Sequence, residues 1–100
     1  MKLITKEIEK RFEEVGSQDG VEDPIVIAKF FNPVGAGNWY ATEYDPITKI
    51  FFGYVSIFGD ECDEWGSFSL AELEGLKLPM GMKIERDLYC GEQPISKFIK

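Results

Sequence analysis

Apolar side chains recur at helical spacing near the start of the chain and at strand spacing further along. Ile8, Phe12 and Val15 follow one another at intervals of four and three residues, which predicts an amphipathic helix over Lys6–Val15. Thr5 stands directly before this segment and has the side chain of a good N-cap. The first element is therefore expected to be a helix with one apolar face.

Four segments rich in β-branched and aromatic residues follow, and short turns separate them. This composition is typical of strands. Links this short favour antiparallel neighbours, because a parallel pair needs a crossover of a dozen or more residues. The predicted strands are Ile25–Asn32, Trp39–Asp45, Ile50–Phe58 and Trp65–Phe68.

The remainder of the chain carries one clear local signal, the capping box Ser69-Leu-Ala-Glu72, which predicts a short helix. Leu78–Met82 is expected to be an irregular apolar loop, Ile84–Tyr89 an edge strand or extended loop, and Pro94–Lys100 a terminal helical turn. The expected fold class is α+β in a single domain over residues 1–100. It comprises an N-terminal helix, an antiparallel four-stranded meander sheet, a short helix after the fourth strand and an irregular C-terminal segment.

Both faces of the strand Ile50–Phe58 are apolar, whereas a solvated antiparallel sheet has one polar face. Two arrangements would explain this. In the first, the N-terminal helix covers one face, and the loop Leu78–Tyr89 with the terminal turn covers the other. In the second, one face stays open as an aromatic groove for a partner. Strict alternation also predicts that Trp39, Glu43 and Asp45 share a face of their strand.

Composition excludes several chemistries. The chain has no His and only two Cys, so it cannot assemble a Cys/His zinc site and lacks the usual general base. Cys62 and Cys90 are expected to be reduced thiols, and we expect no cofactor. A net charge of −7 repels phosphate backbones, so direct nucleic-acid binding is not expected. No segment is apolar for long enough to span a bilayer and the N-terminus lacks a signal-peptide pattern, which predicts a cytoplasmic protein.

The acidic residues gather in the middle of the chain. The stretch 43–74 holds eight acids against one base, Lys49. Its turn Asp60–Glu64 lacks calcium-loop spacing, because Trp65 stands where such a loop needs Gly. Paired carboxylates, Glu43 with Asp45 and Glu85 with Asp87, are chemically able to perform acid–base work or to hold a divalent metal. The simpler interpretation is solvated strand-end acids, with Glu43 or Glu85 paired to Arg86.

Several motifs together resemble a known family. They are Ala28-Lys-Phe-Phe31, Trp39-Tyr40, Thr42-Glu43, Phe51-Phe-Gly-Tyr-Val55, Phe68-Ser-Leu-Ala-Glu-Leu-Glu74 and Leu78-Pro-Met-Gly-Met-Lys-Ile-Glu-Arg-Asp-Leu-Tyr89. In this order they resemble the small bacterial proteins catalogued as domain of unknown function 2958, from the start of the chain to Tyr89. The resemblance implies a bacterial domain often carried by plasmids and other mobile elements. It implies no activity and transfers no functional residue.

These observations favour a non-enzymatic interaction module with a protein partner, and the acidic segment suits a basic one. The alternatives are a small enzyme or small-molecule binder that uses the strand-end carboxylates, and a DNA mimic that inhibits a nucleic-acid-binding protein. The pattern leaves the oligomeric state open, since an uncovered aromatic face also suits a homodimer. The candidate interaction surface comprises Trp39, Glu43, Asp45, Phe52, Tyr54, Glu85, Arg86 and Asp87.

Overall fold

The computed structural model describes residues 2–57 and 63–99. Its first element, α1, spans Lys6–Val15 as the pattern predicts. The hydroxyl of Thr5 accepts a hydrogen bond from the Ile8 amide at 3.3 Å, which satisfies one of the free donors at the start of the helix. Gly16 ends the helix at a φ of 70°, a conformation that glycine adopts without a steric penalty.

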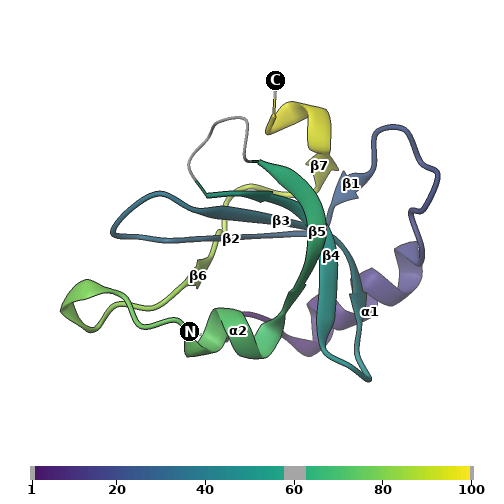
Figure 1. Cartoon of the computed structure of the whole chain (residues 1–100). Coiled ribbons are helices and arrows are strands. Elements are labelled where there is room, and N and C mark those ends of the chain that lie inside the picture. Colours follow the sequence, from purple (N-terminus) through teal and green to yellow (C-terminus); the bar gives the residue numbers. More distant parts are fainter. Residues whose placement is uncertain (1, 58–62, 100) are drawn as a thin grey trace.

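An antiparallel sheet of five strands forms the centre of the molecule (Figure 1). Its strand order is β5-β4-β3-β2-β6, so consecutive strands from β2 to β5 form the expected meander. The prediction of four strands is wrong by one, because a two-residue strand pairs with β2 at the edge. The strands are β2 (Ala28–Phe31), β3 (Asn38–Asp45), β4 (Ile50–Ser56), β5 (Glu64–Ser69) and β6 (Glu85–Arg86).

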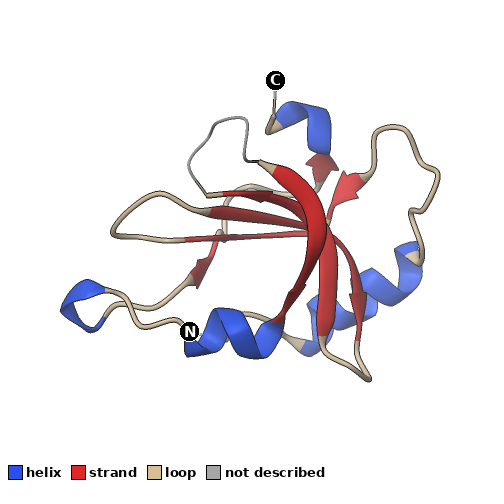
Figure 2. Cartoon of the chain, viewed as in Figure 1, coloured by secondary structure: helices blue, strands red, loops and turns tan. Residues whose placement is uncertain are grey.

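The predicted strand Ile25–Asn32 is divided at Ile27, and its two parts belong to different sheets (Figure 2). β1 (Ile25–Val26) pairs with β7 (Gln93–Pro94) near the C-terminus, whereas β2 continues in the main sheet. The division has a packing reason: Val26 lies in one apolar cluster, whereas Ala28, two positions later, lies in another. A flat strand places residues two apart on the same face, so the chain turns between Val26 and Ala28.

Short helical segments complete the chain. The helix α2 spans Leu70–Gly75, and the hydroxyl of Ser69 accepts a hydrogen bond from the Glu72 amide at 2.9 Å, as the capping box predicts. Single 3₁₀ turns follow at η1 (Pro79–Gly81) and η2 (Ile95–Lys97). Within residues 2–57 and 63–99, no helix is long and apolar enough to cross a membrane.

One side of the main sheet, the inner face, carries the principal core. Phe51 at its centre is fully buried, and α1 and α2 pack over it through Phe12 and Leu73. The loop after α2 joins the same core through Leu78 and Ile84. That loop therefore packs on the same face as the N-terminal helix, and the expectation that it covers the opposite face is wrong.

A β-bulge in β3 changes which side chains share a face. Ala41 lies opposite Gly53, but the next paired residue, Glu43, lies opposite Phe52, so Thr42 is an extra residue in the strand. Because neighbouring residues of β4 point to opposite faces, Glu43 is moved to the face opposite Ala41. The strict alternation expected for Trp39, Glu43 and Asp45 is therefore wrong, and Trp39 is buried in the principal core.

The other side of the sheet, the outer face, is covered only in part. The terminal turn η2 packs Ile95 and Phe98 against Tyr40 of β3, which confirms that this turn lies over the second face. Beyond the turn, Phe52 and Trp65 remain 40% and 42% exposed. The two arrangements expected for the apolar faces are thus combined, with one half of the outer face covered and the other half open.

The buried amide of Gln18 connects the segment after α1 to the bulge. Its Nε2 donates to the carbonyl oxygens of Ile25 and Thr42, both at 2.8 Å, and its Oε1 accepts from the Ile25 amide at 2.7 Å. These three bonds satisfy backbone groups that the bulge and the short strand β1 leave without sheet partners.

Gln18→Ala is expected to lower the free energy of unfolding by about 1–3 kcal/mol, because it leaves buried backbone groups unpaired. Urea denaturation followed by far-UV circular dichroism measures the change. The exposed neighbour Asp19 supplies the control, and Asp19→Ala is expected to stay within about 0.5 kcal/mol of the parent. Equal stabilities of the two variants would contradict the role of Gln18.

Candidate interaction surface

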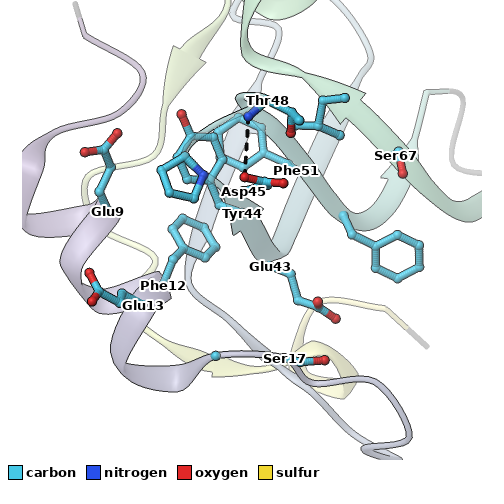
Figure 3. Close-up of a pocket in the computed structure, with 14 residues that line it drawn as sticks. Glu9, Phe12, Glu13, Ser17, Glu43, Tyr44, Asp45, Thr48, Phe51 and Ser67 are labelled. Carbon is cyan, nitrogen blue, oxygen red and sulfur yellow. Dashed lines mark hydrogen bonds between the residues drawn. The ribbon is translucent and has the colours of Figure 1, made fainter.

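A cleft of about 510 Å³ lies where α1 and the residues after it meet β3 and β4 (Figure 3). Glu9 and Glu13 project from α1, and Glu43 and Asp45 come from β3 (Figure 3). Its apolar lining is provided by Phe12, Tyr44, Pro46, Ile50, Phe51 and Phe52. The cleft therefore combines an apolar floor with a rim of carboxylates.

A second hollow of about 270 Å³ adjoins this cleft, and both are lined by Glu43 and Phe52. The connector between α1 and β1 forms one wall, and Trp65 of β5 forms part of the other. We call the two hollows together the acidic groove. Among the described residues that line it there is no Lys or Arg, but there are six carboxylates: Glu9, Glu13, Asp19, Glu22, Glu43 and Asp45.

Aromatic side chains of the outer face form the floor beside this groove. The rings of Phe52 and Trp65 stack with centroids 6.0 Å apart and an interplanar angle of 18°. Tyr54 lies directly opposite Trp65 in the sheet and meets it edge-on at 5.5 Å. The contacts hold the Trp65 indole in place while a large part of it stays open to solvent.

Asp45 has a structural task at the end of β3. Its Oδ1 accepts hydrogen bonds from the amides of Ile47 and Thr48, at 2.9 and 3.4 Å, and these bonds lower the pKa of the carboxyl group. The turn then closes with Lys49 at a φ of 59°. Asp45 therefore remains a carboxylate at neutral pH and shapes the turn, which makes it unsuited to donate a proton there.

Tyr44 contributes a buried hydroxyl to the cleft region. In the part of the chain that the structure describes, this hydroxyl has no hydrogen-bond partner. Burial raises the pKa of Tyr44, and the negative charges of Glu9, Glu74 and Asp45 raise it further. Tyr44 therefore keeps its proton at neutral pH, and a bound group that offers an acceptor would give the hydroxyl the partner that it lacks.

The residues Glu85, Arg86 and Asp87 lie at the opposite edge of the sheet from β5. The Asp87 carboxylate lies 3.6 Å from the Lys29 ammonium, which also sits 5.7 Å from the centre of the Tyr40 ring. The Arg86 guanidinium donates to the carbonyl oxygen of Lys2 at 2.6 Å. These side chains tie β6 and the N-terminal segment to the sheet, away from the acidic groove.

The structure thus divides the surface that the sequence suggested. Glu43, Phe52 and Tyr54 come together on the outer face, and Asp45 stands at the end of the same hairpin. Trp39 lies in the core on the inner face. Sequence reasoning missed Trp65 together with Glu9, Glu13, Asp19 and Glu22. The spacing of Glu9 and Glu13 on one side of a helix was an available signal.

The cysteines add little to this surface. Burial and the charge of Asp87 raise the pKa of the Cys90 thiol, which makes it a poor nucleophile. Cys62, the end of the strand predicted at Ile50–Phe58 and most of the acidic turn Asp60–Glu64 lie outside the described residues. Within the described ranges, no group of three or more Cys, Asp or Glu side chains is placed to hold a metal ion.

Comparison with known proteins gives one match. A family model described as "Protein of unknown function (DUF2958)" matches residues 3–100. The match confirms the resemblance drawn from the sequence motifs and extends it beyond Tyr89 through the terminal turn. No curated protein and no solved structure matches the chain.

Proposed function

The chain belongs to the DUF2958 family of proteins of unknown function, and from that premise we propose that it is a non-enzymatic module that binds a basic segment of a protein partner in the acidic groove. The observation that carries this proposal is the lining of the groove, whose described residues include six carboxylates and no basic residue beside exposed aromatic rings. A partner rich in Lys or Arg complements both features.

Lysine and arginine suit such a surface for two reasons. Their aliphatic stems pack on aromatic rings, and their charged ends are attracted to the faces of Trp and Phe. The net charge of −7 also draws a basic segment toward the protein before contact. Carboxylates around the groove then favour basic partners over acidic ones, because they repel acidic side chains.

The alternative of acid–base catalysis has less support. A catalytic acid needs a carboxyl group whose pKa is raised by burial, whereas hydrogen bonds lower the pKa of Asp45. Inhibition of a nucleic-acid-binding protein is a special case of the proposal, because the basic site of such a protein would meet the same carboxylates. The setting in bacterial mobile elements and the cytoplasmic location stay predictions.

Removing two groove carboxylates tests the proposal. The variant Glu13→Gln/Glu43→Gln is expected to bind a short, end-capped Lys-rich peptide about tenfold more weakly at low salt, which corresponds to about 1.4 kcal/mol. Isothermal titration calorimetry measures the affinity. A change in intrinsic tryptophan fluorescence reports contact with the exposed Trp65, because the other tryptophan, Trp39, is buried in the core.

The matched control is Glu72→Gln/Glu85→Gln, which removes the same charge from α2 and from the edge strand β6. We expect it to change the affinity by less than about twofold, because these side chains lie outside the groove. Equal weakening in both variants would mean that only net charge matters. Affinity that does not respond to added salt would also count against the proposal.

A further inference from the structure

The strand β5 forms one edge of the main sheet. Each residue from Glu64 to Ser69 pairs with β4, and no second strand in the described part of the chain pairs with β5. We propose that the basic segment of the partner binds as an extended strand hydrogen-bonded to this edge. The inference rests on the proposed function and specifies how the segment is held.

The register shows which backbone groups are available. The Leu70 amide donates to the Lys49 carbonyl oxygen at 3.0 Å, so the backbone of Leu70 points toward β4. In an antiparallel pair this direction alternates along the strand. The amide and carbonyl groups of Trp65 and Ser67 therefore point away from the sheet, where an added strand would find two donors and two acceptors.

The edge lacks the features that normally prevent strand addition. Natural edge strands are protected by Lys, Pro, bulges or covering elements. β5 contains neither Lys nor Pro, and its register with β4 runs without a shift. Among the described helices and strands, its main neighbours are its partner β4 and the helix α2 that follows it. Such an edge is a suitable template for an extended peptide.

The chemistry next to the edge selects a basic occupant. Side chains alternate along a strand, so every second residue of an added strand would lie on the outer face beside Trp65. A Lys or Arg there can stack on the exposed indole and extend toward the carboxylates of the acidic groove. The intervening residues would lie on the inner face beside Gly66, where the space around the glycine is open. The geometry therefore favours alternating basic and small apolar residues.

A second copy of the chain fits this edge less well. Its own β5 begins with Glu64 after Asp63 and has no basic residue to place over Trp65. Two such edges would bring like charges together, and each molecule carries a net charge of −7. Charge complementarity thus assigns the edge to a basic partner segment.

The test uses Ser67→Pro and a peptide of alternating Lys and Val. Because the Ser67 amide points away from β4, proline removes the outward donor without removing a hydrogen bond of the existing sheet. We expect Ser67→Pro to bind the peptide at least about tenfold more weakly, whereas Ser67→Ala stays within about twofold. Circular dichroism and urea denaturation establish that both variants are folded.

Backbone methylation of the peptide gives a second readout that does not depend on the protein variant. Methyl groups are placed on every second backbone nitrogen, in one frame on those of the Lys residues and in the other on those of the Val residues. Each frame keeps the charge but removes the amide donors along one edge of the extended peptide. Strand addition predicts that methylation in one frame abolishes binding and methylation in the other leaves it nearly intact. Hydrogen exchange measured by NMR is expected to slow at the amides of Trp65 and Ser67 when the unmodified peptide is bound.

Three results would overturn the inference. Binding that needs Glu13 and Glu43 but ignores Ser67→Pro and both methylation frames would refute strand addition and leave the acidic groove intact as a binding surface. Absence of binding by the basic peptide would refute the inference and the proposed function together. If sedimentation shows a homodimer and Ser67→Pro dissociates it, the edge binds a second copy of the chain instead.

Discussion

Gly53→Ala is expected to destabilise the protein more than any other single-methyl change in the sheet. A Cβ atom at this position would lie 1.8 Å from the carbonyl oxygen of Tyr40 and 2.8 Å from its carbonyl carbon. The obstructing atoms belong to the backbone of β3, just before the bulge at Thr42. They cannot move without breaking sheet pairing, so the loss is expected to reach about 3 kcal/mol or more, the upper end for overpacking.

Gly66→Ala is the matched control for this prediction. Gly66 lies directly opposite Gly53 in the register of β4 and β5, but a Cβ there meets nothing within 4 Å. Urea denaturation of both variants measures the difference. We expect Gly66→Ala to remain within about 0.5 kcal/mol of the parent, and similar stabilities of the two variants would show that β3 does not approach β4 this closely.

Local signals in the sequence were sufficient for much of the fold. The spacing of apolar residues in Lys6–Val15 and the capping box at Ser69 each specify a helix through neighbouring residues alone. The meander from β2 to β5 follows from short turns between β-branched and aromatic segments. In each case the residues that determine the element lie within it or next to it.

Features set by tertiary contacts were predicted only in part. The strand β1 lies within the longer strand predicted at Ile25–Asn32, and β6 lies within the segment expected to be an edge strand or extended loop. The division at Ile27 and the strand β7 depend on distant segments and were not predicted. The bulge at Thr42 has no recognisable residue pattern, yet it decides that Glu43 faces Phe52 rather than the core. The acidic groove depends on this change of face at Glu43. The groove also brings together carboxylates that are far apart in the chain.

Phe51→Ala is expected to cost about 3–5 kcal/mol of folding stability. Phe51 is fully buried on the inner face, and its ring lies 4.5 Å from Tyr44, 5.1 Å from Phe30 and 5.4 Å from Phe68, measured between ring centroids. Truncation leaves a cavity at the centre of these rings, which rigid neighbouring strands cannot fill. Calorimetry or urea denaturation measures the loss.

The adjacent Phe52 tests whether the two faces of β4 have separate tasks. Phe52→Ala removes a ring that is 40% exposed, so the expected loss of stability is only about 1 kcal/mol. The same change removes the ring that stacks on Trp65 and lines both hollows of the acidic groove. It is therefore expected to weaken binding of the Lys-rich peptide by about tenfold in a protein that remains folded. If Phe52→Ala destabilises the chain as much as Phe51→Ala and leaves the affinity unchanged, the outer face is part of the core rather than a binding surface.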